Sequence, residues 1–254
     1  MKQSIILWIG AFVISFLFVF ANRFISPEYP VTGSFGIDMK KVTYQFEKVY
    51  RGKDDYKIII KTEIDSLNGS ILWRVKNSNS GWNAEPMKYS DNTLTGKIPH
   101  QPPSTLIEYQ VKVRKEGKTY YLPQNGKITL KYFSSVPPSI MGFYYLTLYL
   151  ALIFSVRTGL DYFNENQKIK KLAIFTIMIW IANIIVFNPV KHTYELSTRI
   201  GSIVLPITKL FDIQHITILI IWIIGIILIF NLKKYKIWAA IISGATLIAF
   251  LFVQ

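Results

Sequence analysis

The sequence predicts a membrane protein with about five transmembrane helices and one all-β domain of short antiparallel strands. Three observations predict this fold class. The chain has 254 residues, of which 51% are hydrophobic, and few soluble domains reach that value. The hydrophobic residues gather near the N-terminus and after residue 137. Between these regions, short runs alternate between polar and apolar residues, as strands of a half-buried sheet do.

The first hydrophobic segment covers residues 5–21 and is followed by Arg23. Its length of about 17 residues is near the lower limit for crossing a bilayer. An uncleaved signal-anchor helix, within residues 1–23, is the favoured interpretation because the segment is long and aromatic and has no A-x-A site. A cleaved signal peptide is the alternative, with Val19 and Ala21 at the positions before the cut.

A β-domain is predicted for residues 24–137, and its first part, 24–40, is expected to be an extended linker. Proline and glycine at Pro27, Pro30, Gly33 and Gly36 punctuate that part. Short strands are then expected about every ten residues, which is typical of an antiparallel β-sandwich. The expected strands are 43–50, 56–64, 70–76, 85–90, 93–98, 106–115, 119–122 and 127–133.

Residues 81–113 resemble fibronectin type III and related immunoglobulin-like modules of exported bacterial proteins. The stretch begins Gly-Trp-Asn-Ala-Glu-Pro-Met, continues through an Ile-Pro turn at Ile98 and Pro99, and ends in a strand that carries Tyr109. The resemblance implies an immunoglobulin- or fibronectin-III-like sandwich and implies no activity.

Four further hydrophobic segments predict a four-helix transmembrane domain over residues 138–254. The segments are 140–156, 172–190, 215–232 and 237–253. The loops 157–171 and 233–236 are rich in lysine and arginine, so the positive-inside rule places both in the cytoplasm. Counting helices then puts the β-domain on the outer side. We therefore expect a multi-pass protein of the bacterial inner membrane with a periplasmic β-domain.

The segment 200–212 is too short to cross a membrane and contains Pro206. Its apolar residues keep a helical period, which favours an amphipathic helix lying in the outer interface. A re-entrant segment shielded by protein is the alternative.

A short motif closes the first helix of the C-terminal domain: Ser155-Val-Arg157-Thr-Gly159-Leu-Asp161. It resembles the Ser-x-Arg-x-Gly-Leu-acidic signature of an uncharacterised family of bacterial four-helix inner-membrane modules. The resemblance implies a turn after the second helix, which Asn188 and Pro189 could match. The Gly/Trp-rich outer connection of that family is missing here, and the resemblance implies no activity.

Two pairs of polar residues mark the outer connection as a candidate site. His192 and Glu195 are three residues apart, and so are Asp212 and His215. Residues at this spacing share one face of a helix. Two imidazoles and two carboxylates could bind a divalent metal ion, perform general acid–base chemistry on a lipid-linked substrate, or supply histidines to haem. The competing interpretation is that these are ordinary polar residues at helix ends.

Three other residues are candidate partner or ligand contacts. Arg157 and Asp161 are one helical turn apart and could bind a lipid phosphate, although an ion pair that anchors the helix is the simpler interpretation. Trp82 follows a polar loop and could stack on a sugar, whereas Trp73 is expected in the core. Lone glycines at 142, 225 and 244 suggest points of close helix approach.

Composition excludes several functions. The chain has no cysteine, so disulfides, thiolate metal sites and cysteine nucleophiles are excluded. The net charge of +14 is spread along the chain without a basic run, so nucleic acid is not expected as a partner. Motifs for phosphate binding or hydrolysis are absent from the sequence. The predicted function is a non-catalytic envelope subunit that contacts membrane lipids and a protein partner, and no cofactor is predicted beyond a possible divalent metal.

Overall fold

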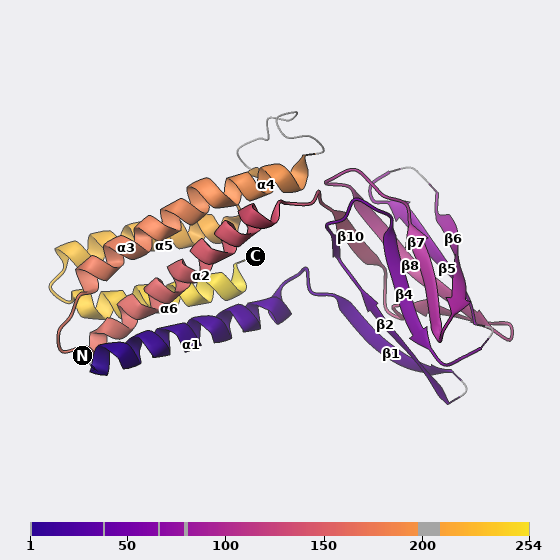
Figure 1. Cartoon of the computed structure of the whole chain (residues 1–254), viewed down its shortest axis with the longest axis horizontal. Helices are drawn as coiled ribbons and strands as arrows, with labels where there is room; N and C mark the ends of the chain where they lie inside the picture. The colour runs from indigo at the N-terminus through magenta and orange to yellow at the C-terminus, as the bar shows by residue number, and fades with distance from the viewer. Residues whose placement is uncertain (1, 38, 66, 79–80, 198–208, 254) are drawn as a thin grey trace. The chain divides into compact units, whose positions relative to one another are not determined.

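The computed structural model describes residues 2–37, 39–65, 67–78, 81–197 and 209–253. The chain divides into two compact units. A helical unit comprises Met1–Pro27, Val136–Tyr194 and Ile203–Gln254, and a β unit comprises Glu28–Ser135 and Glu195–Ser202. Figure 1 shows the helices and strands of both units.

The β unit is one curled sheet of ten strands in the order β1-β2-β4-β7-β6-β5-β8-β10-β3, with β9 paired to β8. All neighbouring strands are antiparallel except β10 and β3. The strands are β1 (Val31–Ile37), β2 (Lys40–Phe46), β3 (Val49–Tyr50), β4 (Tyr56–Thr62), β5 (Asn68–Val75), β6 (Asn83–Ser90), β7 (Thr93–Ile98), β8 (Leu106–Lys115), β9 (Lys118–Leu122) and β10 (Ile128–Tyr132).

Strand β6 curls the sheet because its two ends pair with different neighbours. Residues from Asn83 to Met87 pair with β5, and residues from Lys88 to Ser90 pair with β7. The two halves of the sheet thereby enclose one apolar core, which contains Ile58 and Ile60 of β4 and Tyr109 of β8. The prediction of an all-β domain between hydrophobic helices is confirmed in this form.

The expectation of a linker over residues 24–40 is wrong in its second half. β1 pairs with β2 at seven positions from Val31 to Ile37. Its glycines do not break the strand. At Gly33 the missing side chain leaves room for the ring of Tyr44 on β2, where a Cβ atom would collide with that ring. Glycine is tolerated in strands where another group approaches the backbone closely.

The helical unit contains five helices that are long and apolar enough to cross a membrane, among the described residues. They are α1 (Lys2–Ile25), α2 (Pro138–Leu160) with a short 3₁₀ turn after it (Asp161–Phe163), the helix made of α3 (Ile169–Ile181), η2 (Ala182–Phe187) and α4 (Asn188–Leu196), then α5 (Ile213–Asn231) and α6 (Tyr235–Phe252). Helix α2 contacts α1, α3 and α6. Residues 200–208 of the expected interfacial helix lie outside the described residues.

A π-helical segment, η2, carries the third long helix past Pro189. Proline has no N–H group and clashes with the carbonyl of the preceding turn. The family resemblance implied a turn at Asn188 and Pro189, at the end of the segment 172–190. In the structure the backbone N–H of Asn188 instead bonds to the carbonyl of Asn183, five residues earlier. This wider turn relieves the constraint, and the helix continues to Leu196.

Candidate functional site

Three of the four residues predicted for the outer site come together in the helical unit. Asp212 lies immediately before α5, and its carboxylate makes no capping bond to the helix backbone. One oxygen of that carboxylate, Oδ2, lies 3.1 Å from Nε2 of His192 on α4. The same oxygen lies 3.3 Å from Nδ1 of His215, an ion-pair distance without hydrogen-bond alignment. Asp212 thus joins α4 and α5 through two imidazoles.

The other nitrogen of His215 reaches a tyrosine on a third helix. Nε2 of His215 lies 3.4 Å from the hydroxyl of Tyr144 on α2, and both side chains are buried. The ammonium of Lys191 lies over the Tyr144 ring, 4.5 Å from its centre. Asp212, His215 and Tyr144 therefore form a chain from carboxylate to imidazole to phenol. We call His192, Asp212, His215 and Tyr144 the outer polar cluster.

The two imidazoles beside Asp212 stabilise the negative charge of its carboxylate. Burial on its own would raise the pKa of Asp212, but His192 and His215 outweigh it and hold that pKa well below its usual range. The side chain of Asp212 is 41% exposed, whereas that of His215 is only 4% exposed. The carboxylate consequently stays ionised at any ordinary pH and can orient His215.

Glu195 does not join this cluster. Its carboxylate, 4% exposed, pairs with the guanidinium of Arg51 at 3.2 Å. Glu195 belongs to the β unit, and its backbone carbonyl oxygen accepts a hydrogen bond from the backbone N–H of Ser134. The sequence spacing of three residues placed Glu195 beside His192 on a helix, but spacing alone does not reveal this competing cation.

The described residues contain no group of three or more His, Asp or Glu side chains that could hold a metal ion. In the outer polar cluster, both imidazoles are directed at a single carboxylate oxygen, and His215 also contacts Tyr144. A metal ion would need those nitrogens as free ligands. Of the four residues proposed as metal ligands, His192, Asp212 and His215 therefore contact one another, and Glu195 pairs with Arg51 instead.

Arg157 and Asp161 form a buried pair, as the simpler interpretation of their spacing predicts. The distance from Nη1 to Oδ1 is 2.8 Å, and the two side chains are 3% and 0% exposed. Asp161 also accepts bonds from Asn164 Nδ2 and from the backbone N–H of Lys168. This carboxylate thus fixes the turn between α2 and α3, and burial leaves it no room to bind a lipid phosphate.

Trp82 lies on the surface of the β unit beside two cations. The guanidinium of Arg74 is 4.7 Å from the centre of its ring, and the ammonium of Lys127 is 4.6 Å away. Arg74 is held in turn by Glu108 at 2.7 Å, and this bond lowers the pKa of Glu108. Two cations therefore already contact the indole ring, which leaves less of its surface for stacking on a sugar.

Sequence reasoning missed Tyr144 as a member of the outer polar cluster. It is separated from His215 by 71 residues and sits in an aromatic stretch, Phe143-Tyr144-Tyr145, where it resembles an interfacial anchor. Only the packing of α2 against the other helices distinguishes it from Tyr145.

Comparisons with known proteins add little to this picture. No family model matches the chain, and no curated protein matches it. A solved structure described as "Crystal structure of Br derivative BhCBM56" is similar, with 13% identity over 42% of this chain and 94% of that chain, and a TM-score of 0.25. We draw no functional conclusion from a similarity of this size.

Proposed function

We propose that the protein is a membrane-anchored, non-catalytic subunit whose β unit docks an extended segment of a partner protein along the free edge of β1. In this proposal the helical unit crosses the bacterial inner membrane, and the β unit, an immunoglobulin- or fibronectin-III-like module, lies on the periplasmic side. The basic loops support this orientation.

The edge of β1 is the observation that carries the proposal. β1 stands at one end of the strand order and, among the described residues, pairs only with β2. Its sequence, Val-Thr-Gly-Ser-Phe-Gly-Ile, has no charge and no proline. Proteins commonly protect a free edge with lysine, proline or a bulge, because an open row of N–H and C=O groups pairs with other strands. Strand addition at such an edge is a common mode of peptide recognition.

The covalent connections of the β unit support a docking role. The chain enters it from α1 and leaves it into α2, so both ends are attached to helices that can cross a membrane. An anchored domain meets a partner in the same membrane at a raised effective concentration. A modest strand–strand contact can then suffice for stable association.

The experiment compares two Thr→Lys variants on the same face of the sheet. Thr32→Lys places a charge on the edge strand, and Thr95→Lys places the same charge on β7, which is paired on both sides. Tagged protein at native level is purified in a gentle detergent, and bound proteins are identified by mass spectrometry. We expect a stoichiometric membrane or periplasmic partner with wild type and Thr95→Lys, and at least a tenfold loss with Thr32→Lys.

Equal retention of the partner by all three proteins would exclude the β1 edge as the docking site. A homo-oligomer without any partner would contradict the subunit role itself. Crosslinking through a photoreactive residue at Ser34, which is exposed on β1, then reports directly whether the partner lies along this strand.

The outer polar cluster supports a second candidate function, acid–base chemistry at the outer end of the helical unit. Asp212 lies beside Nδ1 of His215, and in the tautomer that carries its proton on Nδ1, Nε2 can accept the hydroxyl proton of Tyr144. This is the order of groups that activates a hydroxyl nucleophile in hydrolases.

An aryl fluorosulfate probe tests the reactivity of Tyr144. If His215 activates the phenol, the probe modifies Tyr144 faster than Tyr149 one and a half turns further along α2, and His215→Ala removes the difference. Equal rates in wild type and His215→Ala, measured by peptide mass spectrometry, would end this candidate.

A further inference from the structure

One half of the curled sheet carries five lysines on its outer face: Lys41 on β2, Lys57 and Lys61 on β4, Lys88 on β6 and Lys97 on β7. Strand register places them on a common face. Lys61 pairs with Thr43 and Thr93, Lys57 pairs with Lys97, and Lys88 pairs with Thr95, the partner of Ile59. We call these five residues the lysine face.

Two of the lysines are direct cross-strand neighbours. Lys57 of β4 and Lys97 of β7 occupy opposite positions in the antiparallel ladder. Side chains at such positions have Cβ atoms about 5 Å apart, and like charges there destabilise a sheet. The fold thus keeps an arrangement that costs stability, which an anionic partner would reverse.

The lysines of this face are not neutralised by ion pairs with the described residues. Among the described residues, none of its five ammonium groups makes an ion pair. On the other half of the sheet, by contrast, Arg74 pairs with Glu108, and Lys127 lies over Trp82. Acidic residues stand at the ends of its strands: Asp55 before β4, Glu47 after β2, Glu63 after β4 and Asp91 in the turn between β6 and β7. Three of them, Glu47, Glu63 and Asp91, also line the hollows described next.

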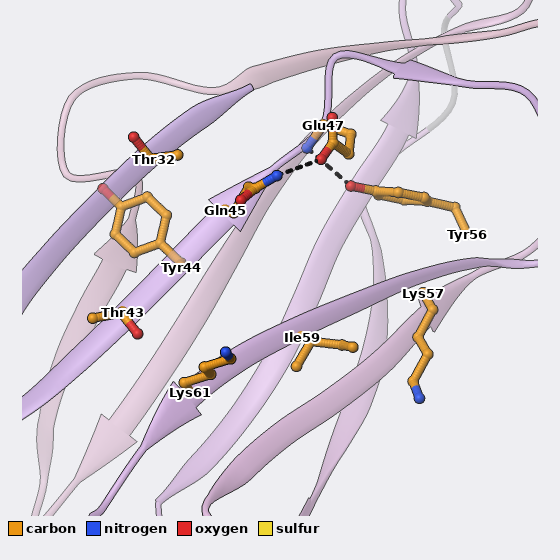
Figure 2. A pocket seen from close by; sticks show the side chains of 9 residues that line it. All are labelled: Thr32, Thr43, Tyr44, Gln45, Glu47, Tyr56, Lys57, Ile59 and Lys61. Atoms are coloured by element: carbon orange, nitrogen blue, oxygen red, sulfur yellow. Dashed lines mark hydrogen bonds between the residues drawn. The ribbon is translucent and has the colours of Figure 1, made fainter. Parts of the chain in front are cut away.

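Two adjoining hollows form a shallow trough over the part of this face that carries Lys41, Lys57 and Lys61. The first, of about 390 Å³, lies over β2 and β4 and is drawn in Figure 2, with Lys57, Ile59 and Lys61 along one strand and Thr43 and Gln45 along the next. The second, of about 410 Å³, shares Thr43 and Lys61 with the first and extends to Lys41 and Thr93, and the carboxylates of Glu63 and Asp91 belong to its lining. Hydroxyl, amide and ammonium groups therefore line the trough, with carboxylates at its ends.

We propose that the lysine face binds an extended polyanion in which phosphate groups alternate with polyol or sugar units. Ammonium groups suit phosphate charges without demanding one geometry, as a flexible polymer requires. Threonine, serine and glutamine on the face supply hydrogen bonds for hydroxyl groups. Nucleic acid fits less well, because single strands stack their bases on exposed aromatic rings. Two tyrosines line the first hollow, but Tyr56 is only 5% exposed, and Tyr44 is stacked on Phe46 with its hydroxyl against Gly33, so neither presents an open ring for stacking.

A lipid surface also fits less well. Proteins that bind the membrane interface add buried apolar or aromatic side chains to their basic residues. The outward positions of β4 offer only Ile59 between Lys57 and Lys61. An anionic polymer that is neither lipid nor nucleic acid is therefore the partner that the chemistry of the lysine face favours.

The test uses the full chain in nanodiscs of phosphatidylcholine and a purified poly(glycerol phosphate). We expect salt-sensitive binding, because lysine–phosphate contacts release counterions. The double variant Lys57→Gln, Lys97→Gln should bind about tenfold more weakly at low salt and show a shallower salt dependence. The same variant should melt no lower than wild type, because a like-charge pair has been removed.

The matched control is Lys112→Gln, Lys118→Gln on β8 and β9, which changes the net charge equally on the other half of the sheet. Retained binding by this control supports the lysine face. Equal weakening by both double variants, or no binding by wild type, overturns the proposal. Stronger binding to oligothymidylate with the same number of phosphates, or to phosphatidylglycerol vesicles, overturns the assignment to a polyol phosphate polymer.

Discussion

Asp212 shows how one carboxylate can organise residues that lie far apart in the sequence. Its Oδ2 atom lies within 3.3 Å of both His192 and His215, and His215 continues to Tyr144. Tyr144, His192 and His215 lie on α2, α4 and α5, so the loss of one side chain weakens contacts among all three helices. Such polar networks stabilise a structure only while every member has its partner.

The pH dependence of stability should report on Asp212. Its pKa is lowered in the folded protein, so the stabilisation it contributes is complete above its ordinary pKa of about 3.9 and is lost as pH falls towards the lowered value. We expect Asp212→Asn to melt about 2–4 °C below wild type at pH 7, with the gap closing below about pH 4. Its partial exposure keeps the effect small.

Melting curves in detergent between pH 3 and pH 7 check this expectation. The parallel variant Asp161→Asn serves as a comparison, because that carboxylate is bound by other groups and is fully buried. If the difference in melting temperature between wild type and Asp212→Asn stays constant down to pH 3, the proposed origin of the lowered pKa is contradicted.

The buried ion pair at the other end of α2 should be far more costly to break. Arg157→Met leaves the Asp161 carboxylate, 0% exposed, without its cation. Removing one partner of a buried pair typically costs about 3–5 kcal/mol. The matched variant Arg23→Met, in the last turn of α1 where the side chain is exposed, should change stability by less than about 0.5 kcal/mol. Similar thermal stability for both variants would show that the Arg157 pair is not desolvated.

Helix α2 approaches α6 at Gly159. A Cβ atom at this position would lie 2.5 Å from Cβ of Ser243, closer than packed atoms allow. Small residues at such crossings let helix backbones pack closely in membranes. Gly225 of α5 meets Ile242 in the same way, as the sequence suggested, whereas Gly142 and Gly244 have open space around them.

Alanine substitutions at these glycines should distinguish two effects on stability: steric overlap with a neighbouring helix, and the higher helix propensity of alanine. Gly159→Ala should lower the free energy of unfolding by about 1–3 kcal/mol through overpacking. Gly142→Ala should raise it slightly, by about 0.5–1 kcal/mol, because alanine favours the helix and nothing lies nearby. Thermal melting of the two variants in one detergent measures the difference, and equal effects would mean that α6 can move away from α2.

The sequence predicted the elements well because their periodicity depends on local patterning. The run 56–64 is rich in β-branched residues and the run 106–115 alternates, and the structure contains them as β4 (Tyr56–Thr62) and β8. Strand β1 was missed because Gly33 and Gly36 read as turn residues, and their role depends on Tyr44 and β2 across the sheet. The continuation past Pro189 was missed because a π-helical turn has no clear signal in one sequence.

The candidate site was predictable only in part. His192, Asp212 and His215 could be chosen because polar residues are rare beside hydrophobic segments, and the structure brings them together. Glu195 and Tyr144 could not be assigned, since Arg51 and α2 come from distant parts of the chain. Long-range contacts of this kind leave no spacing pattern to detect.

At the scale of the molecule, the proposed topology can be tested by cysteine labelling, because the chain contains no cysteine. Single cysteines can be introduced without background labelling. Asp54→Cys, on an exposed loop of the β unit, should react with a membrane-impermeant maleimide in intact cells. Asn166→Cys, between α2 and α3, should react only after the inner membrane is permeabilised. The reverse pattern would invert the topology.

The placement of the β unit between α1 and α2 also has a consequence for how the protein is made. These two helices pack together, with Trp8 and Phe154 in edge-to-face contact at 5.1 Å, although the whole β unit separates them in the sequence. During translation, the β unit is therefore synthesised after α1 and before α2, so α1 cannot pack against α2 until that domain has been made. Folding of the β unit meanwhile replaces a long flexible loop by a fixed connection, which lowers the entropic cost of pairing the helices. A defect in the β core should accordingly appear first as slow membrane assembly, and α1 would be the segment left open to quality-control proteases.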